Sequence, residues 1–320
     1  QGAVSMILVT GGMGFIGVHV VKSLLDAGED VVLTWNRSWR VPDFWEAELG
    51  KRVIAEKVDV ANPHEVTGVA LRHKVNGIIH CAAPGLGQGT PTQDYAVNMQ
   101  GLVNAIEAAR AAEVRRFTYL GSSTVYNGLK SGPYREDSPL PLESRNATEA
   151  YKKAGETVLM HYADRIGLSI ATIRPRQVYG PMYYSMANLP SRLCHAAVKG
   201  ALPDYGPAGV PFAADTGDFT SVRDVAEITA VVHQAETLQH RVYNMGGGRA
   251  FEMQELAEAV MAAAPEARIE LKPGENPNGS PAGNYLDLTR VKDEFGYTPR
   301  YPIAEKGIAD YIAWLRSHPQ

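Results

Sequence analysis

Several features that would indicate a specialised class of protein are scarce or missing in this chain of 320 residues. It has only two cysteines, Cys81 and Cys194, which lie far apart and lack the spacing of a metal site. We therefore expect two buried, reduced thiols rather than a disulfide, as is usual in the cytoplasm. Four histidines also lack metal-ligand spacing, so they are expected to be structural and no metal site is predicted: His19, His80, His161 and His195.

The chain also lacks an excess of one charge and any long apolar run. Its 31 basic and 35 acidic residues give a formal net charge of −4, which does not support binding to nucleic acid or to a membrane surface. No apolar run approaches the roughly 18–20 residues of a membrane span, and the N-terminus does not resemble a signal peptide. We expect a cytoplasmic globular protein that acts on a small-molecule substrate.

The most informative stretch lies near the start of the chain. Met6–Val9 is a short apolar run, typical of a strand that is buried on both faces. Gly11, Gly14 and Gly17 follow at G-x-x-G-x-x-G spacing, and Val18–Leu25 is apolar with helical period. In a dinucleotide-binding turn the first glycine permits the tight turn, the second lets backbone N–H groups approach the pyrophosphate, and the third lets helix and strand pack closely. A purely structural glycine turn is the alternative.

Strands and helices alternate through the first half of the chain. The predicted strands are Met6–Val9, Asp30–Trp35, Lys51–Val60, Gly77–His80, Arg116–Leu120 and Leu168–Arg174. The predicted helices are Val18–Leu25, Asn62–Val75, Gln93–Ala112 and Thr148–Ile166, and Gly85–Thr90 is expected to be a loop. This alternation predicts an α/β protein with a doubly wound parallel sheet, the Rossmann fold.

Beyond Pro175 the regular alternation fades, although Arg268–Leu271 still has the pattern of a strand. We predict that residues 1–174 and 217–245 form the dinucleotide-binding domain. Residues 175–216 and 246–320 are predicted to form a smaller C-terminal lobe that binds the substrate.

The end of the second predicted strand bears on the choice between NAD and NADP. Sites that prefer NAD usually carry Asp or Glu here, which holds the ribose 2′-hydroxyl. This chain offers Asn36 and Arg37, with Arg40 nearby and no acidic residue between Trp35 and Arg40. Because an arginine suits a 2′-phosphate, the sequence favours NADP over NAD. The alternative is that these arginines are solvated loop charges.

Ordered motifs along the chain extend this interpretation. They are Thr10–Gly17, Asp59-Val60, Ala82-Ala83, Tyr95–Gly101, Gly121–Tyr126, Lys152–Glu156, Arg174–Pro181, Asp218–Asp224, Tyr243–Gly246 and Phe295–Pro299. With these motifs the chain resembles the extended short-chain dehydrogenase/reductases, the NAD-dependent epimerase/dehydratase family, over nearly its whole length. The resemblance implies an NAD(P)-dependent enzyme, and a homodimer formed through the helices predicted at Gln93–Ala112 and Thr148–Ile166.

The resemblance also implies roles for individual residues. In this family a lysine holds the nicotinamide ribose and lowers the pKa of a tyrosine, whose phenolate takes a proton from a substrate alcohol while hydride leaves for the nicotinamide. A serine donates a hydrogen bond to the same substrate oxygen. By motif position these are Lys152 and Ser122. The motifs place further cofactor contacts at Phe15, Ile16, Asp59, Val60, Ala82, Ala83, Asn98, Lys152 and Gln177.

The tyrosine of the family is missing. Thr148 stands four residues before Lys152, where the tyrosine is expected. A phenol has a pKa near ~10 and an aliphatic hydroxyl is a much weaker acid, so Thr148 can orient a substrate or a water but is a poor general base. Tyr151 points about 100° around the helix from Lys152. The alternative proton carriers are Tyr126, Tyr151, Glu149 or a water held by Ser122 and Thr148.

Three functions therefore remain open. The first is hydride chemistry on a hydroxy or carbonyl substrate, as in an oxidoreductase or epimerase, with a non-standard proton carrier. The second is a lyase-type cleavage of a C–C or C–O bond on the same scaffold. The third is dinucleotide binding without turnover, as in a sensor.

Two further departures from the family pattern concern the substrate. Its Arg-Asp-Phe pattern, whose arginine often meets the diphosphate of a nucleotide sugar, reads Gly217-Asp218-Phe219 here, and the Asn of its Asn-Val-Tyr-Gly-Pro pattern is Gln177. The missing arginine argues against a nucleotide sugar. An apolar substrate pocket is suggested by Met182, Tyr183, Tyr184 and Met186. We expect a small hydroxy- or carbonyl-bearing substrate.

Overall fold

The computed structural model describes residues 6–84, 89–279 and 283–319, so residues 85–88 of the expected loop lie outside the described part. The chain divides into two compact units. The first comprises residues 1–128, 139–174 and 226–243, and the second comprises residues 129–138, 175–225 and 244–320.

Three segments that we placed in the first domain fall in the second unit, namely residues 129–138, 217–225 and 244–245. Residues 129–138 do so because Tyr134 forms a β-bridge with Leu286. Residues 217–225 do so because Gly217 pairs with Phe251 in a short antiparallel ladder. The division of cofactor and substrate binding between the two units remains a prediction.

A parallel sheet in the order β10-β6-β5-β4-β1-β2-β3 confirms the predicted Rossmann fold. From β1 the chain first adds β2 and β3 on one side and then crosses to add β4 on the other side. Ligands of such sheets bind at the carboxyl ends of the strands beside this crossing point. The strands of the sheet are β1 (Met6–Thr10), β2 (Asp30–Trp35), β3 (Val53–Lys57), β4 (Gly77–His80), β5 (Arg116–Leu120), β6 (Ile170–Pro175) and β10 (Val242–Met245).

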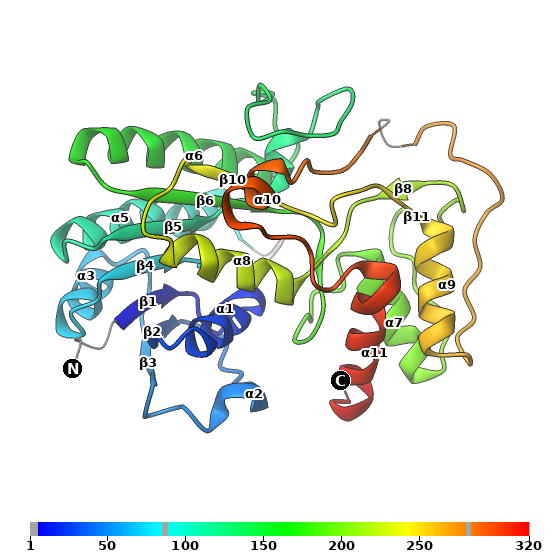
Figure 1. The fold of residues 1–320 in the computed structure, drawn as a ribbon, viewed down its shortest axis with the longest axis horizontal. Helices are drawn as coiled ribbons and strands as arrows, with labels where there is room; N and C mark the ends of the chain where they lie inside the picture. The colour runs from blue at the N-terminus through cyan, green and yellow to red at the C-terminus, as the bar shows by residue number, and fades with distance from the viewer. Residues whose placement is uncertain (1–5, 85–88, 280–282, 320) are drawn as a thin grey trace. The chain divides into compact units, whose positions relative to one another are not determined.

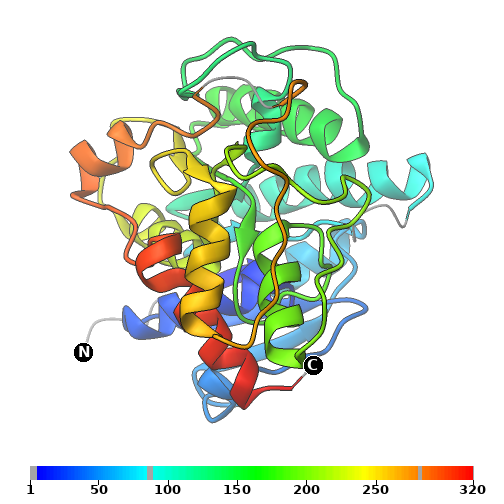
Figure 2. The same cartoon turned by 90° about the vertical axis from the view of Figure 1, so that its right-hand side faces the viewer.

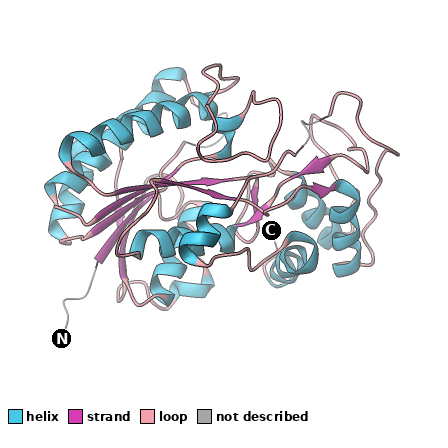
Figure 3. Ribbon diagram, turned by 45° about the horizontal axis from the view of Figure 1, so that its top comes forward, coloured by secondary structure: helices cyan, strands magenta, loops and turns pink. Residues whose placement is uncertain are grey.

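Helices cover both faces of this sheet, as Figures 1 and 3 show. On one face, α3 (Pro63–Arg72), α5 (Gly101–Ala111) and α6 (Ala147–Ile166) pack their apolar side chains onto the strands in one buried cluster. The other face carries α1 (Phe15–Asp26) and residues 226–234 of α8 (Val222–Gln234). His233 of α8 lies so close to the sheet that a Cβ at Gly77 would be 2.2 Å from its Nε2 atom.

Three local features differ from the sequence-based expectations. The predicted helix Gln93–Ala112 begins earlier and is interrupted: a capping box at Thr90 starts α4 (Pro91–Tyr95), and a π-helical turn, η1 (Ala96–Gln100), precedes α5. The strand predicted at Lys51–Val60 ends at Lys57, because the Asp59 carboxylate accepts the N–H of Ala61 and forms a turn. The short helix α2 (Asp43–Glu46) was not expected; the indole of Trp45 is buried and donates to the Val18 carbonyl at 2.9 Å.

The second unit has a helical core of its own. The helices α7 (Leu189–Lys199), α9 (Met253–Ala263) and α11 (Ile308–Ser317) lie side by side around a buried apolar cluster, as Figure 2 shows. No helix among the described residues is long and apolar enough to span a bilayer. The remaining elements of the chain are η2 (Ser123–Tyr126), β7 (Val178–Tyr179), β8 (Thr216–Gly217), β9 (Thr220–Ser221), β11 (Phe251–Glu252), α10 (Thr289–Phe295) and the π-helical turn η3 (Ile303–Gly307).

The strand predicted at Arg268–Leu271 does not form. The hydroxyl of Tyr205 donates to the carbonyl of Glu270 at 2.8 Å and accepts the N–H of the same residue at 2.9 Å. One phenol therefore satisfies the backbone groups that a neighbouring strand would otherwise satisfy. The sequence pattern could not show that a side chain would pair with these backbone groups.

The close packing of α1 on β1 gives a first prediction. A Cβ at Gly17 would lie 2.4 Å from the Gly11 carbonyl oxygen and 2.8 Å from Gly12 Cα, which are backbone atoms that cannot rotate away. We expect Gly17→Ala to lower the free energy of unfolding by about 1–3 kcal/mol, as overpacking typically does. Gly68→Ala is the matched control, because a Cβ there meets only the end of the exposed Arg72 side chain, at 3.1 Å. Urea denaturation that shows Gly17→Ala to be as stable as Gly68→Ala would contradict this account.

Candidate active site

The glycine turn lies at the carboxyl end of β1, where it touches the segment that follows β4. Gly11 adopts a left-handed φ of +65°, and its N–H donates to Thr34 Oγ1 at 3.2 Å. A Cβ at Gly11 would lie 2.7 Å from Ala82 Cα, so only glycine lets these two segments approach. The structure thus brings together Gly11 and Ala82, two of the residues predicted to bind the cofactor.

The start of α1 has the features of an anion site. Gly14 is the N-cap residue, and no side chain forms a capping hydrogen bond at this helix end. Gly14 is exposed, whereas Phe15 and Ile16 are half-buried in the first helical turn. The N–H groups of a first helical turn have no intrahelical acceptor and carry partial positive charge, so an uncapped, exposed helix start fits a pyrophosphate.

Neighbouring strands end at the same edge of the sheet. Asn36 and Arg37 directly follow β2 and are exposed, while Asp59 and Val60 follow β3. The Asp59 carboxylate accepts the N–H of Ala61 at 3.0 Å, and the Val60 carbonyl accepts a hydrogen bond from the Asn104 side chain at 2.9 Å. Ala83 follows Ala82 after β4 and is also exposed. These residues stand where a doubly wound sheet binds its ligand.

Two further residues predicted to bind the cofactor lie outside the strand ends. Asn98 belongs to the π-helical turn η1, where its side-chain amide donates to the Asp94 carbonyl at 2.9 Å. Gln177 belongs to the second unit and has a left-handed φ of +38°. Met182 and Met186, nine residues or fewer beyond Gln177, also have positive φ. Such strained backbone in non-glycine residues is frequent at functional sites.

Lys152 reaches the end of β5 from α6. Its Nζ atom donates to the Leu120 carbonyl at 2.5 Å and lies 4.6 Å from the centre of the Tyr119 ring. Burial lowers the pKa of the half-buried Lys152 amine to about 8, although Cys81 and Glu156 act in the opposite direction. A lysine that is cationic in bulk water is therefore close to losing its proton at neutral pH.

Ser122 and Thr148 complete this part of the site. Ser122 begins η2, two residues after Leu120, and its Oγ accepts hydrogen bonds from the N–H and the hydroxyl of Thr124 at 3.2 and 3.0 Å. Thr148 is half-buried, one helical turn before Lys152 on the same face of α6. Within the described residues, the Thr148 side chain forms no hydrogen bond.

The tyrosines proposed as proton carriers are held in other interactions. The Tyr126 hydroxyl accepts a hydrogen bond from Arg174 at 2.6 Å and is buried. Arg174 also donates to both carboxylate oxygens of Glu156, at 2.6–3.2 Å, so the three side chains form a buried cluster. The Tyr151 hydroxyl donates to the Pro91 carbonyl at 3.3 Å, which agrees with its expected direction away from Lys152.

Glu149, the third proposed carrier, is a buried carboxylate with several donors. It accepts hydrogen bonds from the Asn127 amide at 2.6 Å and from the Arg145 backbone and guanidinium at 3.0–3.2 Å. Burial raises its pKa, but the hydrogen bonds and the charge of Arg145 outweigh burial and lower the pKa below the usual value. Glu149 is thus held as a carboxylate at the start of α6.

The second unit contains a cavity of about 400 Å³ beside α7. Tyr184 and Met186 line it together with charged and polar side chains from α7 and the following loop, and whether it binds the substrate remains a prediction. Met182 and Tyr183 are instead buried. The other lining residues are Arg192, His195, Ala196, Lys199, Ala201, Leu202 and Asp204.

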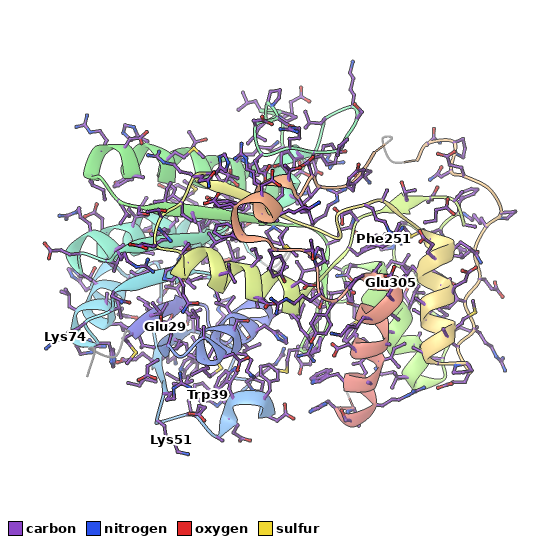
Figure 4. All side chains as sticks on the ribbon, viewed as in Figure 1. Glu29, Trp39, Lys51, Lys74, Phe251 and Glu305 are labelled. Atoms are coloured by element: carbon purple, nitrogen blue, oxygen red, sulfur yellow. The ribbon has the colours of Figure 1, made fainter. Side chains whose placement is uncertain are left out.

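Position 217, where the family resemblance places a diphosphate-binding arginine, is closely packed by neighbouring side chains. Gly217 pairs with Phe251, which Figure 4 labels at the start of α9. A Cβ at Gly217 would lie 2.9 Å from the Phe219 ring and 3.1 Å from the Met253 methyl group. The next residue, Asp218, is fully buried and accepts N–H groups from Gly247 and Leu286 at 2.6 and 2.8 Å. Burial, despite these bonds, raises the pKa of Asp218 to about 6.

Sequence reasoning missed the surroundings of Lys152. It did not identify the Leu120 carbonyl or the Tyr119 ring as its contacts, because a backbone acceptor at a strand end leaves no sequence pattern. A usable signal did exist for the Arg174–Glu156 pair. A charged residue that ends an apolar strand must find a partner when it is buried, and Glu156 was already among the motif residues.

Among the described residues, no group of three or more His, Cys, Asp or Glu side chains is arranged to hold a metal.

Comparison with known proteins agrees with this arrangement of a Rossmann sheet, a glycine turn and a helical lysine. A model of the NAD-dependent epimerase/dehydratase family matches residues 7–246. The UDP-glucose 4-epimerase of Mycolicibacterium smegmatis is 31% identical over 322 residues, which cover 98% of this chain and 99% of that protein. The dTDP-glucose 4,6-dehydratase of an Actinoplanes species is 27% identical over 327 residues, with 98% of each protein covered.

A solved structure shows the same relationship. The UDP-glucose 4-epimerase of Thermus thermophilus, in complex with NAD, matches with a TM-score of 0.79 at 25% identity and covers 98% of this chain and 99% of that one. The site and fold thus define an enzyme of the extended short-chain dehydrogenase/reductase class. Within that class, the chain belongs to the NAD-dependent epimerase/dehydratase family, as its motifs predicted.

The buried cluster of Tyr126, Glu156 and Arg174 gives a second prediction. Removing one partner of a buried ion pair leaves the other charge uncompensated, so Glu156→Gln is expected to lower the free energy of unfolding by about 3–5 kcal/mol. Tyr126→Phe removes one hydrogen bond to a charged group and is expected to cost about 1.5–3 kcal/mol. Tyr151→Phe is the matched control and should change stability by less than about 0.5 kcal/mol. Chemical denaturation measures all three, and a stable Glu156→Gln variant would contradict the assigned role of the pair.

Proposed function

We propose that this enzyme uses a nicotinamide dinucleotide to oxidise or reduce a small hydroxy- or carbonyl-bearing substrate, transiently or with net turnover. Proton transfer in this reaction does not use the family's tyrosine. The observation that carries the proposal is the placement of Lys152 at the end of β5, with Thr148 one turn before it, in the unit that also contains the glycine turn. The site thus keeps the family's lysine but has no phenol four residues before it.

The residues at the carboxyl edge of the sheet fit the cofactor. Gly14 is exposed at an uncapped helix start, where a pyrophosphate would bind, while Gly11 and Gly17 let the turn pack closely. Lys152 would hold the nicotinamide ribose. Bound there, a nicotinamide supplies a hydride acceptor or donor. Ser122 would donate its hydroxyl hydrogen to the substrate oxygen, and Thr148 would orient the substrate or a water. The similar structure of the Thermus thermophilus UDP-glucose 4-epimerase is a complex with NAD, which supports a cofactor of this type.

Position 217 supports a substrate that is not a nucleotide sugar. Side-chain atoms of Phe219 and Met253 pack closely around Gly217, and this position has no guanidinium that could bind a diphosphate. The names of the related proteins favour the opposite function, because the Mycolicibacterium and Actinoplanes relatives are enzymes of UDP-glucose and dTDP-glucose. The two candidates differ in one measurable property, which is affinity for UDP-glucose.

A binding and turnover experiment tests this function. We expect purified protein with NAD or NADP to convert a member of a panel of small alcohols, aldehydes and β-hydroxy carbonyls, with products identified by chromatography. The absorbance of the reduced cofactor changes if the substrate is oxidised or reduced with net turnover. It stays constant in an epimerase or lyase reaction that leaves the cofactor unchanged. Calorimetry with UDP-glucose is expected to show a Kd weaker than about 1 mM, corresponding to about −4 kcal/mol. Tight binding and epimerisation of UDP-glucose would instead establish the nucleotide-sugar function, and cofactor binding with no product from either group would indicate a sensor.

We further propose that the enzyme prefers NADP to NAD. Arg37 is exposed directly after β2 and forms no ion pair with any described residue, so its guanidinium is available to a 2′-phosphate. A charged hydrogen bond contributes about 1.5–3 kcal/mol, so Arg37→Ala should weaken NADP binding at least about 10-fold and leave NAD binding within about 2-fold. Arg110→Ala removes an exposed arginine on α5 and is the control. Calorimetry that finds NAD to bind more tightly than NADP in the wild type would overturn this preference.

The homodimer that the family resemblance implies remains a prediction. Its proposed helices correspond to the region from α4 to α5 and to α6. Light scattering of the purified protein measures this state directly.

A further inference from the structure

The proposed chemistry needs a group that can lose and regain a proton beside Ser122. None of the three side chains that could replace the missing tyrosine is well suited to this. Tyr126 is buried and accepts a hydrogen bond from Arg174, and the Tyr151 hydroxyl is directed to the Pro91 carbonyl. Glu149 accepts hydrogen bonds from several donors that hold it in its ionised form, so it takes up a proton poorly at neutral pH.

Lys152 has contacts of a different kind. Its Nζ atom donates to a neutral carbonyl, that of Leu120, and lies over the uncharged ring of Tyr119. Within the described residues, no carboxylate lies within 4 Å of this nitrogen to form an ion pair. A half-buried ammonium without a counter-ion is destabilised relative to its neutral amine, because the neutral form needs less solvation.

The titratable groups on the surrounding elements are neutral or already paired. After β4, burial raises the pKa of the Cys81 thiol to about 12, and burial together with the charge of Lys152 lowers the pKa of His80 to about 3. In β5, burial raises the pKa of Tyr119. On α6 itself, the Glu156 carboxylate is charged, but Arg174 binds both of its oxygens. Cys81 and Glu156 raise the pKa of Lys152, but burial outweighs them, and no carboxylate forms an ion pair with its amine among the described residues.

From this geometry we propose that Lys152 is itself the proton carrier of the reaction, in addition to holding the cofactor ribose. The proposal rests on the proposed function. In the oxidative direction the neutral amine accepts the hydroxyl proton of the substrate alcohol and becomes an ammonium. The C–H bond of the same carbon breaks with its electron pair, which leaves as hydride to the oxidised nicotinamide. The alcohol thus loses one proton and one hydride and becomes a carbonyl, and the ammonium returns the proton in the reverse direction.

The substitution at position 148 is consistent with this role. A tyrosine four residues before Lys152 would place a phenol between the amine and the substrate and would carry the proton itself. A threonine is shorter by the whole ring, so the substrate oxygen can approach the amine directly or through one water. The pKa of about 8 for Lys152 suits a group that must both accept and release a proton near neutral pH.

A labelling experiment tests the proton affinity of Lys152 without requiring turnover. Purified protein is labelled with a trace of acetic anhydride from pH 6 to pH 11, and mass spectrometry follows each lysine. The matched control is Lys153, the next residue on α6, whose Nζ donates to the Glu143 carbonyl at 2.6 Å in a solvent-exposed hydrogen bond. We expect the reactivity of Lys152 to rise around pH 8, below the ~10.4 of a lysine in a reference peptide and below the pH at which Lys153 becomes reactive. A rise of Lys152 within half a pH unit of Lys153 would overturn the proposal.

Two charge-preserving variants separate proton transfer from cofactor binding. Lys152→Arg keeps a cation for the ribose but cannot lose its proton below about pH 12. We expect it to bind the cofactor within about 3-fold of the wild type and to lose at least about 10²-fold in kcat, together with the rise of oxidation rate through pH 8. Lys153→Arg should behave as the wild type, and thermal unfolding checks that both variants fold.

The outcomes of the two experiments can be told apart. A Lys152→Arg enzyme that keeps a tenth or more of wild-type kcat with the same pH profile would show that Lys152 only positions the cofactor, which would overturn the proposal. A wild type that turns over no substrate would refute the proposed function. The labelling profile would then still decide whether Lys152 has the proton affinity that the proposal requires.

Discussion

The buried pair of Arg174 and Glu156 is the constraint on which the geometry of the candidate site depends. Arg174 extends from β6, Glu156 from α6, and the third member of the cluster, Tyr126, from η2. The pair therefore ties a strand of the sheet to the helix of Lys152 and to the turn of Ser122. A buried ion pair adds little net stability over an apolar contact, but it fixes direction, since both partners must be satisfied at once. Lys152 lies one turn before Glu156 on the same helix, so the cluster sets its position relative to the Leu120 carbonyl.

Much of the first unit could be predicted from the sequence, because its signals are local. Gly11 and Gly17 mark the turn by spacing alone, and β2, β4 and β5 have the predicted bounds because each is a short apolar run ended by turn residues. The prediction failed where partners come from distant parts of the chain. At Glu270 a single phenol replaces a neighbouring strand, and at Tyr134 a bridge to Leu286 assigns a loop to the second unit. Neither partner is visible in a local window of sequence.

The candidate site shows the same limit. Its residues could be identified by position in the motifs, and the missing tyrosine at Thr148 could be recognised without a structure. The sequence could not show the local environment of the Lys152 side chain. Burial lowers the pKa of this amine, while Cys81 after β4 and Glu156 on α6 raise it. The chemical state of a motif residue is thus a property of tertiary packing, even where its identity is a property of sequence.

The two departures from the family pattern have a common structural form. At Thr148 the phenol is absent, while Lys152 one turn later still reaches the strand end. At Gly217 the arginine is absent, while Asp218 beside it still accepts two backbone N–H groups and Phe219 fills the space. In both places the side chain that would meet a ligand is changed and its structural neighbour is kept. The change of substrate and of proton carrier proposed above would alter residues of this kind and leave their structural neighbours in place.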